Sequence, residues 1–163
     1  MILFQITEEH QIKLDDDKEA EVSFFHWSVT GDRYFHSSIN GTMLKLGEFL
    51  LRIKTSPDMV IDHKNNDRFD YQISNLRVAS KSQNAANSKL RVDSTTGYKG
   101  VTFNKRHGKY YAQIKINYKM YYLGCFVTPE EAALKYNEAA KKAFGVFARL
   151  NNVENVKDLF NNF

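Results

Sequence analysis

Apolar and polar residues alternate most regularly between residues 98 and 126, and this pattern predicts an antiparallel sheet. We expect three strands and two tight turns, at 98–103, 109–116 and 119–126 and at 106–108 and 117–118. Side chains alternate between the two faces of a strand. The middle strand would therefore have one apolar face and one polar face, made respectively by Tyr110, Ala112, Ile114 and Ile116 and by Tyr111, Gln113 and Lys115.

A helix with a stripe of small side chains is predicted directly after this sheet. Thr128 and Glu131 have the spacing of a capping box, and Pro129 occupies the first helical position. Gly145 is a plausible stop signal. The stripe at helical spacing consists of Ala132, Ala133, Tyr136, Ala139, Ala140 and Ala143. The pattern predicts a three-stranded antiparallel sheet with one helix packed across its apolar face.

The first 90 residues have a less regular pattern, rich in strand-forming residues. We expect short strands at about 21–29, 33–38 and 42–46, whereas the apolar run 46–53 fits either a short helix or a buried strand. Residues 59–90 predict a strand, a long polar loop, a short strand and a helix. Ser80 and Gln83 form a capping-box pattern that starts this helix near Lys81. The fold class predicted for the whole chain is α+β.

Shifts in composition divide the chain into five predicted segments. They are a β-rich lead-in, a compact central unit, a linker, a sheet-and-helix domain and a tail, at residues 1–58, 59–92, 93–97, 98–151 and 152–163. A short helix is expected near 153–160. The turn-forming cluster Asp15–Asp17 is interpreted as a solvated turn.

The charge of the chain is unevenly distributed. The net charge is +4, yet residues 93–150 alone carry 10 basic and 4 acidic residues. Between Lys99 and Val127 there are six basic residues and no acid. A run of one sign, interleaved with aromatic residues on strands, favours a polyanionic partner over a merely solvated face.

Composition also excludes several classes of protein. A single cysteine, Cys125, rules out an intramolecular disulfide, and we expect it to be a buried thiol beside core aromatic residues. No cysteine and histidine spacing resembles a zinc site. The chain lacks a signal peptide and an apolar run long enough to cross a bilayer, so we expect a cytoplasmic protein with no membrane partner.

Residues 60–87 bring together the side chains that phosphodiester hydrolysis requires. Asp62 and Asn84 supply oxygen ligands of the kind that Mg²⁺ or Mn²⁺ accepts, and we expect one such divalent cation. His63 is placed to take a proton from an attacking water. Asn75 fits two roles equally well, as a catalytic residue or as a residue that stabilises the loop. Asp62 and His63 are adjacent, so the strand must bend there or the two must act from different sides.

The segment VIDHKNNDRFDYQISNLRVASKSQNAAN, residues 60–87, resembles the HNH nuclease core of phage and intron-encoded endonucleases. The resemblance implies a ββα-metal fold for 59–92. It implies that His63 is the general base, and that Asp62 and Asn84 bind the metal. By the same resemblance Asn75 orients the loop or the base, and Arg77 supports the core or contacts a phosphate. The chain departs from the family at residues 70–72, and at Gly47, where many members carry a histidine.

Residues 98–151 resemble the APETALA-two DNA-binding domain of plant ethylene-response factors. The matching pieces are YKGV, GKYYAQIK, YLGCF, TPEEAALKYNEAA and FARLN. The resemblance implies that the sheet enters the major groove of DNA. The positions that would contact DNA are Lys99, Thr102, Asn104, Gln113, Lys115, Met120 and Tyr122, with Lys105 and Arg106 contacting nearby phosphates.

Three functional hypotheses follow. The first is a site-selective, metal-dependent endonuclease of nicking or homing type, acting on double-stranded DNA, for which a monomer is favoured over an oligomer. The second is a DNA-binding protein whose HNH core is degenerate and does not cleave. The third is an RNA-binding module that stacks unpaired bases on exposed tyrosines.

Overall fold

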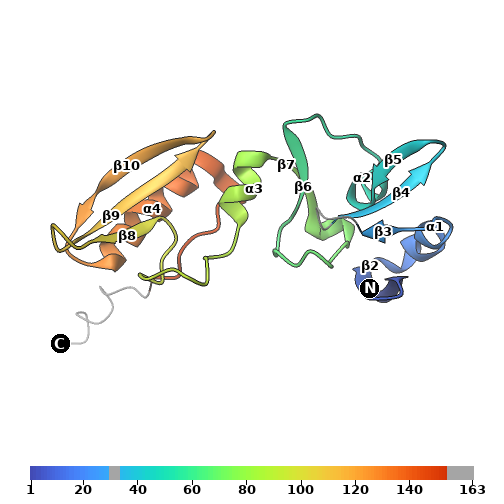
Figure 1. Cartoon of the computed structure of the whole chain (residues 1–163), viewed down its shortest axis with the longest axis horizontal. Helices are drawn as coiled ribbons and strands as arrows, with labels where there is room; N and C mark the ends of the chain where they lie inside the picture. The colour runs from blue at the N-terminus through green and yellow to red at the C-terminus, as the bar shows by residue number, and fades with distance from the viewer. Residues whose placement is uncertain (30–33, 154–163) are drawn as a thin grey trace. The chain divides into compact units, whose positions relative to one another are not determined.

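The computed structural model describes residues 1–29 and 34–153 (Figure 1). Within them the chain mixes helices with several small antiparallel sheets, as the predicted α+β class requires. The chain divides into two compact units, residues 1–81 and 82–163. This division falls earlier than the predicted linker at 93–97, which lies inside the second unit. The two units are described in turn.

The first unit begins with a hairpin followed by a short helix. Strand β1 (Ile2–Thr7) pairs with β2 (His10–Leu14), and helix α1 spans Glu19–Ser23. The strand predicted at 21–29 is therefore wrong, except for β3 (Ser28–Val29). Alanine and glutamate favour the helix. The helix also buries Val22, whose carbonyl accepts a 2.9 Å hydrogen bond from the Trp27 indole.

A second small sheet and a short helix complete the centre of this unit. Strand β4 (Phe35–Ile39) pairs with β3 and with β5 (Thr42–Lys45), close to two of the predicted strands; predicted residue 33 lies outside the described residues. Residues Leu46–Leu50 form helix α2, which resolves the ambiguity of the apolar run. The core of the unit is built mainly from Ile12, Leu14, Val22, Trp27, Phe35, Leu46 and Leu50.

The last element of the first unit is the predicted strand–loop–strand. Strand β6 (Met59–His63) pairs antiparallel with β7 (Leu76–Ser80), and a short 3₁₀ turn, Ile73–Asn75, leads into β7. The register places Asp62 opposite Arg77 and His63 opposite Leu76. Strand β6 continues through His63, so Asp62 and His63 start from opposite faces of the hairpin.

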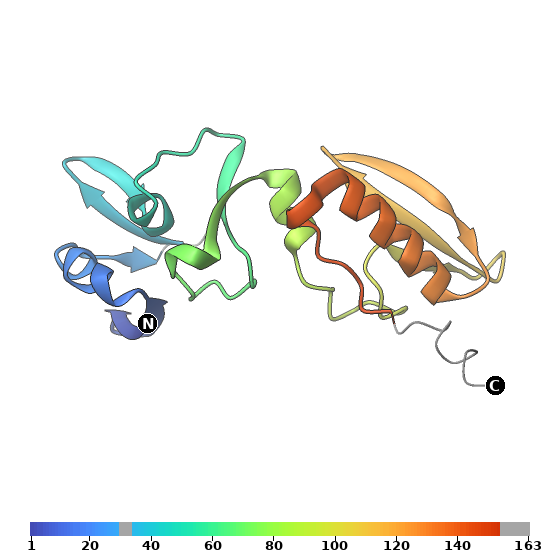
Figure 2. The ribbon, with the colours of Figure 1, turned by 180° about the vertical axis from the view of Figure 1, so that it is seen from behind.

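The second unit contains the predicted sheet and helix. Helix α3 (Lys81–Asn87) begins at Lys81 as expected, and from Ser82 onward it belongs to this unit. The sheet has the order β10-β9-β8, and α4 lies across one of its faces (Figure 2). The bounds are Val101–Asn104 for β8, Lys109–Ile116 for β9, Lys119–Phe126 for β10 and Pro129–Phe144 for α4.

Side-chain burial in this unit follows the predicted faces. Ala112 and Ile114 of β9 are buried, and Ile114 packs with Tyr136 and Ala140 of α4 and with Ala86 of α3. The Thr128 and Glu131 capping box is present, and α4 ends at Gly145, which has a φ of 53°. Ala143 faces outward instead of joining the predicted stripe, and the neighbouring Phe144 is buried in its place.

A bulge in β10 changes which side chains face outward. The register shifts between Tyr122 and Gly124, and Gly124 has a φ of 134°. The extra residue lets Leu123 and Phe126 both pack inward while Cys125 turns outward with Tyr122. The prediction of a buried thiol is therefore wrong: Cys125 is exposed. Phe103 of β8 is 44 % exposed.

Two expectations about the ends of the chain and membranes remain. The helix predicted near 153–160 falls almost entirely outside the described residues. Among the helices that the structure describes, none is long and apolar enough to cross a membrane.

Gly100 offers a test of the packing of α4 on the sheet. Its φ is 75°, and an added Cβ would collide with the Tyr136 ring and lie 2.7 Å from the Gln113 carbonyl oxygen. We expect Gly100→Ala to lower the free energy of unfolding by roughly 3 kcal/mol or more, because steric overlap adds to backbone strain.

Gly97→Ala is the matched control, because Gly97 has a φ of 73° with open space around its Cα. Strain alone should cost about 1–2 kcal/mol. Urea denaturation of both variants measures the difference. Equal losses would show that Gly100 is not a close-packed position.

Candidate active site and nucleic-acid face

The β6–β7 hairpin holds a buried ion pair. Asp62 is 3 % exposed, and its Oδ2 accepts a 2.7 Å hydrogen bond from Nε of Arg77, which is 15 % exposed. The two residues face each other across the ladder, so the strand register itself sets their separation. Burying a carboxylate without such a partner would be costly. Arg77 thus pairs with Asp62, and its predicted roles, supporting the core or contacting a phosphate, stay predictions.

His63 is held beside the hydrophobic core. Its ring packs edge-on against Tyr71, with ring centroids 4.9 Å apart. Burial lowers the pKa of His63, and the negative charges of Asp62, Asp70 and Asp67 oppose this only in part. A lowered pKa keeps the imidazole neutral at neutral pH, which is the form that can accept a proton. Burial raises the pKa of Tyr71, so its hydroxyl stays protonated.

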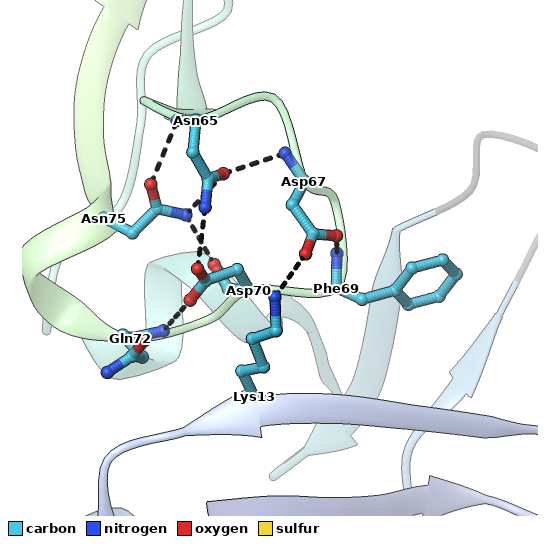
Figure 3. Close-up of polar contacts among 7 residues, drawn as sticks. All are labelled: Lys13, Asn65, Asp67, Phe69, Asp70, Gln72 and Asn75. Atoms are coloured by element: carbon cyan, nitrogen blue, oxygen red, sulfur yellow. Dashed lines mark hydrogen bonds and ion pairs between the residues drawn. The ribbon is translucent and has the colours of Figure 1, made fainter. Parts of the chain in front are cut away.

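The loop between the strands is closed by the carboxamide of Asn75 (Figure 3). Its Oδ1 accepts a hydrogen bond from the Asn65 backbone N–H at 3.1 Å. Its Nδ2 donates to Asn65 Oδ1 at 3.1 Å and to the Asp70 carbonyl at 2.9 Å. Asn75 is 9 % exposed, so these bonds are shielded from water. The structure places Asn75 as a loop clamp, which is one of its two expected roles.

Two aspartates extend this clamp and tie the loop to β2. Asp70 Oδ2 accepts from Asn65 Nδ2 at 2.7 Å, and Asp67 Oδ2 pairs with Lys13 Nζ at 2.8 Å (Figure 3). The hydrogen bond from Lys13 lowers the pKa of Asp67. The backbone of Lys13 also bonds to Phe69 and Tyr71, at 2.7 and 2.9 Å. The loop that follows His63 is therefore fixed to a neighbouring strand.

Sequence reasoning missed these supporting residues, although a signal for them exists. Asn65, Asp67 and Asp70 each accept a hydrogen bond from the backbone N–H two residues later, which is the Asx-turn pattern. Successive Asx residues at such spacing indicate an ordered loop. Asp15, interpreted as part of a solvated turn, accepts from the Ile73 N–H at 2.8 Å. No sequence signal pairs residues so far apart.

Asn84 lies on α3 and is half-buried. It belongs to the second unit, whereas Asp62, His63 and Asn75 belong to the first. Within the described residues no group of three or more His, Cys, Asp or Glu side chains could hold a metal ion. The Asp62 carboxylate and the Asn84 amide are each hard oxygen donors of the kind that Mg²⁺ accepts, and their role as metal ligands stays a prediction.

The face of the second-unit sheet opposite α4 is exposed and aromatic. We call it the recognition face, and it consists of Thr102, Tyr111, Gln113, Lys115, Met120, Tyr122 and Cys125. Cross-strand pairing brings Tyr122 beside Gln113 and Met120 beside Lys115. The rings of Tyr111 and Tyr122 meet edge-on with centroids 5.5 Å apart. Tyr122 is 61 % exposed, so this face presents rings and cations together.

The turn beside this face carries more positive charge. Lys105 and Arg106 are exposed there, and Asn104 organises the turn. Asn104 Oδ1 accepts from the backbone N–H groups of Arg106 and His107, at 3.0 and 3.1 Å. Asn104, which is predicted to contact DNA, therefore also stabilises this turn.

Lys99 has surroundings unlike those of the other predicted DNA contacts. Its ammonium donates to the carbonyls of Ala86 and Ser88, at 2.5 and 2.9 Å, and lies 3.3 Å from the Ala85 carbonyl. It thereby caps the C-terminus of α3. Burial lowers the pKa of Lys99 to about 8. Lys99 therefore binds the end of α3, which the sequence did not indicate, and its contact with DNA stays a prediction.

Comparison with known proteins agrees with the interpretation of the first unit. Residues 55–86 match the HNH endonuclease family. A protein of Acanthamoeba polyphaga mimivirus, named an uncharacterized HNH endonuclease, is 29 % identical over 142 residues, covering 85 % of this chain and 73 % of that protein. This similarity extends well beyond the family match and includes much of the second unit. That relative is from a giant virus, not from a phage. No solved structure matches the chain.

The Lys99→Met variant tests whether the ammonium of Lys99 stabilises the end of α3 or contacts DNA. Loss of the ammonium removes its hydrogen bonds to the Ala86 and Ser88 carbonyls at the end of α3, so we expect the free energy of unfolding to fall by about 1–3 kcal/mol. Lys115→Met, at an exposed position of the recognition face, is the matched control and should leave stability unchanged.

DNA affinity at several salt concentrations completes this comparison. Lys115→Met should weaken binding and reduce the salt slope by about one, whereas Lys99→Met should leave the slope unchanged. A reduced slope in Lys99→Met without loss of stability would show that Lys99 contacts phosphate.

Proposed function

We propose that the protein is a site-selective, metal-dependent DNA endonuclease in which the first unit supplies the general base and the second unit binds double-stranded DNA. The observation that carries the proposal is the position of His63. It lies at the end of β6, packed edge-on against Tyr71 and next to the buried Asp62 that pairs with Arg77, inside a segment that matches HNH endonucleases. Fixed placement of a base beside an oxygen ligand is what hydrolysis of a phosphodiester requires.

The proposed roles follow from the contacts of each residue. His63 accepts a proton from the attacking water. Asp62, held by Arg77, and Asn84 would hold one divalent cation, Mg²⁺ or Mn²⁺. When bound, that ion would stabilise charge on the phosphate and the departing oxygen. Asn75 keeps the loop after His63 closed, so it acts on the base by positioning rather than by contact with substrate.

The DNA-binding role of the second unit rests on its exposed basic and aromatic sheet face. That face accords with an APETALA-two-like mode of binding, in which a sheet enters the major groove. Gln113 and Lys115 would approach base edges or backbone, and the exposed Tyr122 lies beside Gln113 on the neighbouring strand. A single site of this kind would cut one strand, so a monomer should nick, and a double-strand break would need a dimer or two events.

Nicking of supercoiled plasmid tests the division of labour. In magnesium or manganese, we expect wild-type protein to produce open circles. His63→Ala and Asn84→Ala should reduce the nicking rate by about 10²-fold or more, because each removes a group needed only for hydrolysis. DNA affinity should stay within about twofold in both variants.

His26→Ala, at an exposed histidine of the same unit, is the matched control and should nick like wild type. Chelation by EDTA should abolish nicking in every sample. Parallel loss of cleavage and binding in the His63 and Asn84 variants would contradict the assignment. Tight binding without cleavage by the wild-type protein would favour the second hypothesis, a DNA-binding protein with an inactive core.

Salt dependence tests the partner. Five exposed cations lie on or beside the sheet, Lys105, Arg106, Lys109, Lys115 and Lys119. If they meet phosphates, the logarithm of duplex affinity should fall with the logarithm of salt concentration at a slope of roughly −4 to −5. A slope near zero, or tighter binding to single-stranded RNA at the same salt, would favour the base-stacking alternative offered by the exposed tyrosines.

A further inference from the structure

A small recess lies beside His63 within the first unit. Its polar lining comes from several elements and includes Tyr34, Lys45, Glu48, Thr55, His63 and Tyr71, while Val60 and Ile61 of β6 form an apolar wall. The cavity volume is about 20 Å³, enough for one water-sized group. The recess would therefore admit a single oxygen atom of a larger ligand rather than a whole nucleotide.

Lys45 is the cation of this recess. It is the last residue of β5, it is half-buried, and its ammonium lies 5.0 Å from the centroid of the Tyr34 ring. None of the carboxylates in the described part of the chain forms an ion pair with it. Two other cations near the hairpin, Lys13 and Arg77, are paired with aspartates, and Lys64 donates to the Ser74 carbonyl.

Glu48, the carboxylate in the same recess, is bonded to Thr55 and forms no ion pair with Lys45. Glu48 is 9 % exposed, and its Oε1 accepts a 3.0 Å hydrogen bond from the Thr55 backbone N–H and another from the Thr55 hydroxyl. Thr55 thus satisfies Glu48 locally. A half-buried ammonium that forms no ion pair with a described carboxylate leaves the recess suited to an anion.

Close packing fixes the wall that carries Lys45. Helix α2 follows Lys45 directly, and at Gly47 an added Cβ would lie 3.0 Å from Cγ2 of Ile61 on β6. An added side chain at position 47 would require Ile61 to shift by a few tenths of an ångström, so α2 approaches β6 closely. The polar side chains that this segment adds to the recess are those of Lys45 and Glu48. Lys45 is thereby held on the same recess as His63 by backbone packing.

We propose that Lys45 binds a non-bridging oxygen of the scissile phosphodiester beside His63. This inference rests on the proposed nuclease function and names the residue that contacts the substrate phosphate. Hydrolysis forms a bond from a water oxygen to phosphorus and breaks a bond from phosphorus to a sugar oxygen. The water proton passes to His63, and the departing oxygen takes a proton from solvent. Lys45 stays protonated and offsets the charge that grows on the phosphate.

Binding of inorganic phosphate to the metal-free, full-length protein tests the anion site without any cleavage. The imidazole NMR signals of His63 follow the titration. Wild type should show a saturable shift, Lys45→Met should bind at least about tenfold more weakly, and Lys45→Arg should recover most of the affinity. Lys54→Met, an exposed lysine of the same unit, is the control and should match wild type.

The titration has a clear contrary result. Absence of a saturable shift at His63 in wild type, or equal phosphate affinity in wild type and Lys45→Met, would overturn the proposal. A normal circular dichroism spectrum for Lys45→Met excludes unfolding as the cause of a loss. Phosphate binding does not depend on catalysis, so the role of Lys45 is tested even if the protein fails to nick DNA.

Kinetics distinguish a role in the reaction from general attraction of DNA. Lys45→Met should lower kcat for plasmid nicking by about 10²–10³-fold and leave KM within about twofold, since the contact strengthens in the transition state. Lys54→Met should change neither. If wild type nicks and Lys45→Met nicks at the same rate, the role of Lys45 is wrong while the nuclease function stands.

Discussion

The clamp made by the carboxamide of Asn75 is the contact on which the geometry of the first unit depends. Twelve residues separate His63 from Leu76, and ordering so long a polar loop has a large entropic cost. Asn75 offsets this cost by bonding to Asn65 and to the Asp70 carbonyl, at the far side of the loop. Lys13 and Asp67 then join the loop to β2. As a result the chain after His63 follows one defined path and fixes the position of the imidazole, as the proposed role of general base requires.

Two cations near the hairpin have structural roles. Arg77 forms an ion pair with the buried Asp62, and Lys13 forms one with Asp67. Removing one member of the buried pair would cost about 3–5 kcal/mol. Lys45 lies in the recess beside His63, where Thr55 donates hydrogen bonds to the carboxylate of Glu48. Lys45 is therefore the cation that we propose to bind the substrate, while Arg77 and Lys13 stabilise the fold.

Periodicity predicted the second unit well because its sheet and helix each bury one regular face. The capping box at Thr128, the stop at Gly145 and the two faces of β9 were all readable. Two features of the second unit could not be predicted: the bulge at Gly124 reverses the expected orientation of Cys125, and Lys99 binds the end of helix α3. In the first unit, burial of Val22 accompanies a helix where a strand was predicted. In the first unit, motif residues were visible, whereas Lys13, Asp15 and Lys45 depend on long-range packing that local pattern does not encode.

The central claim is that Asp62 and Asn84 hold one divalent cation that serves His63. Anomalous diffraction from manganese-soaked crystals of the full chain locates that ion directly. The account predicts a bound manganese ion with an oxygen of Asp62 and an oxygen of Asn84 in its coordination shell, completed by water. An ordered ion held by other residues, with both of these side chains outside its shell, would contradict it.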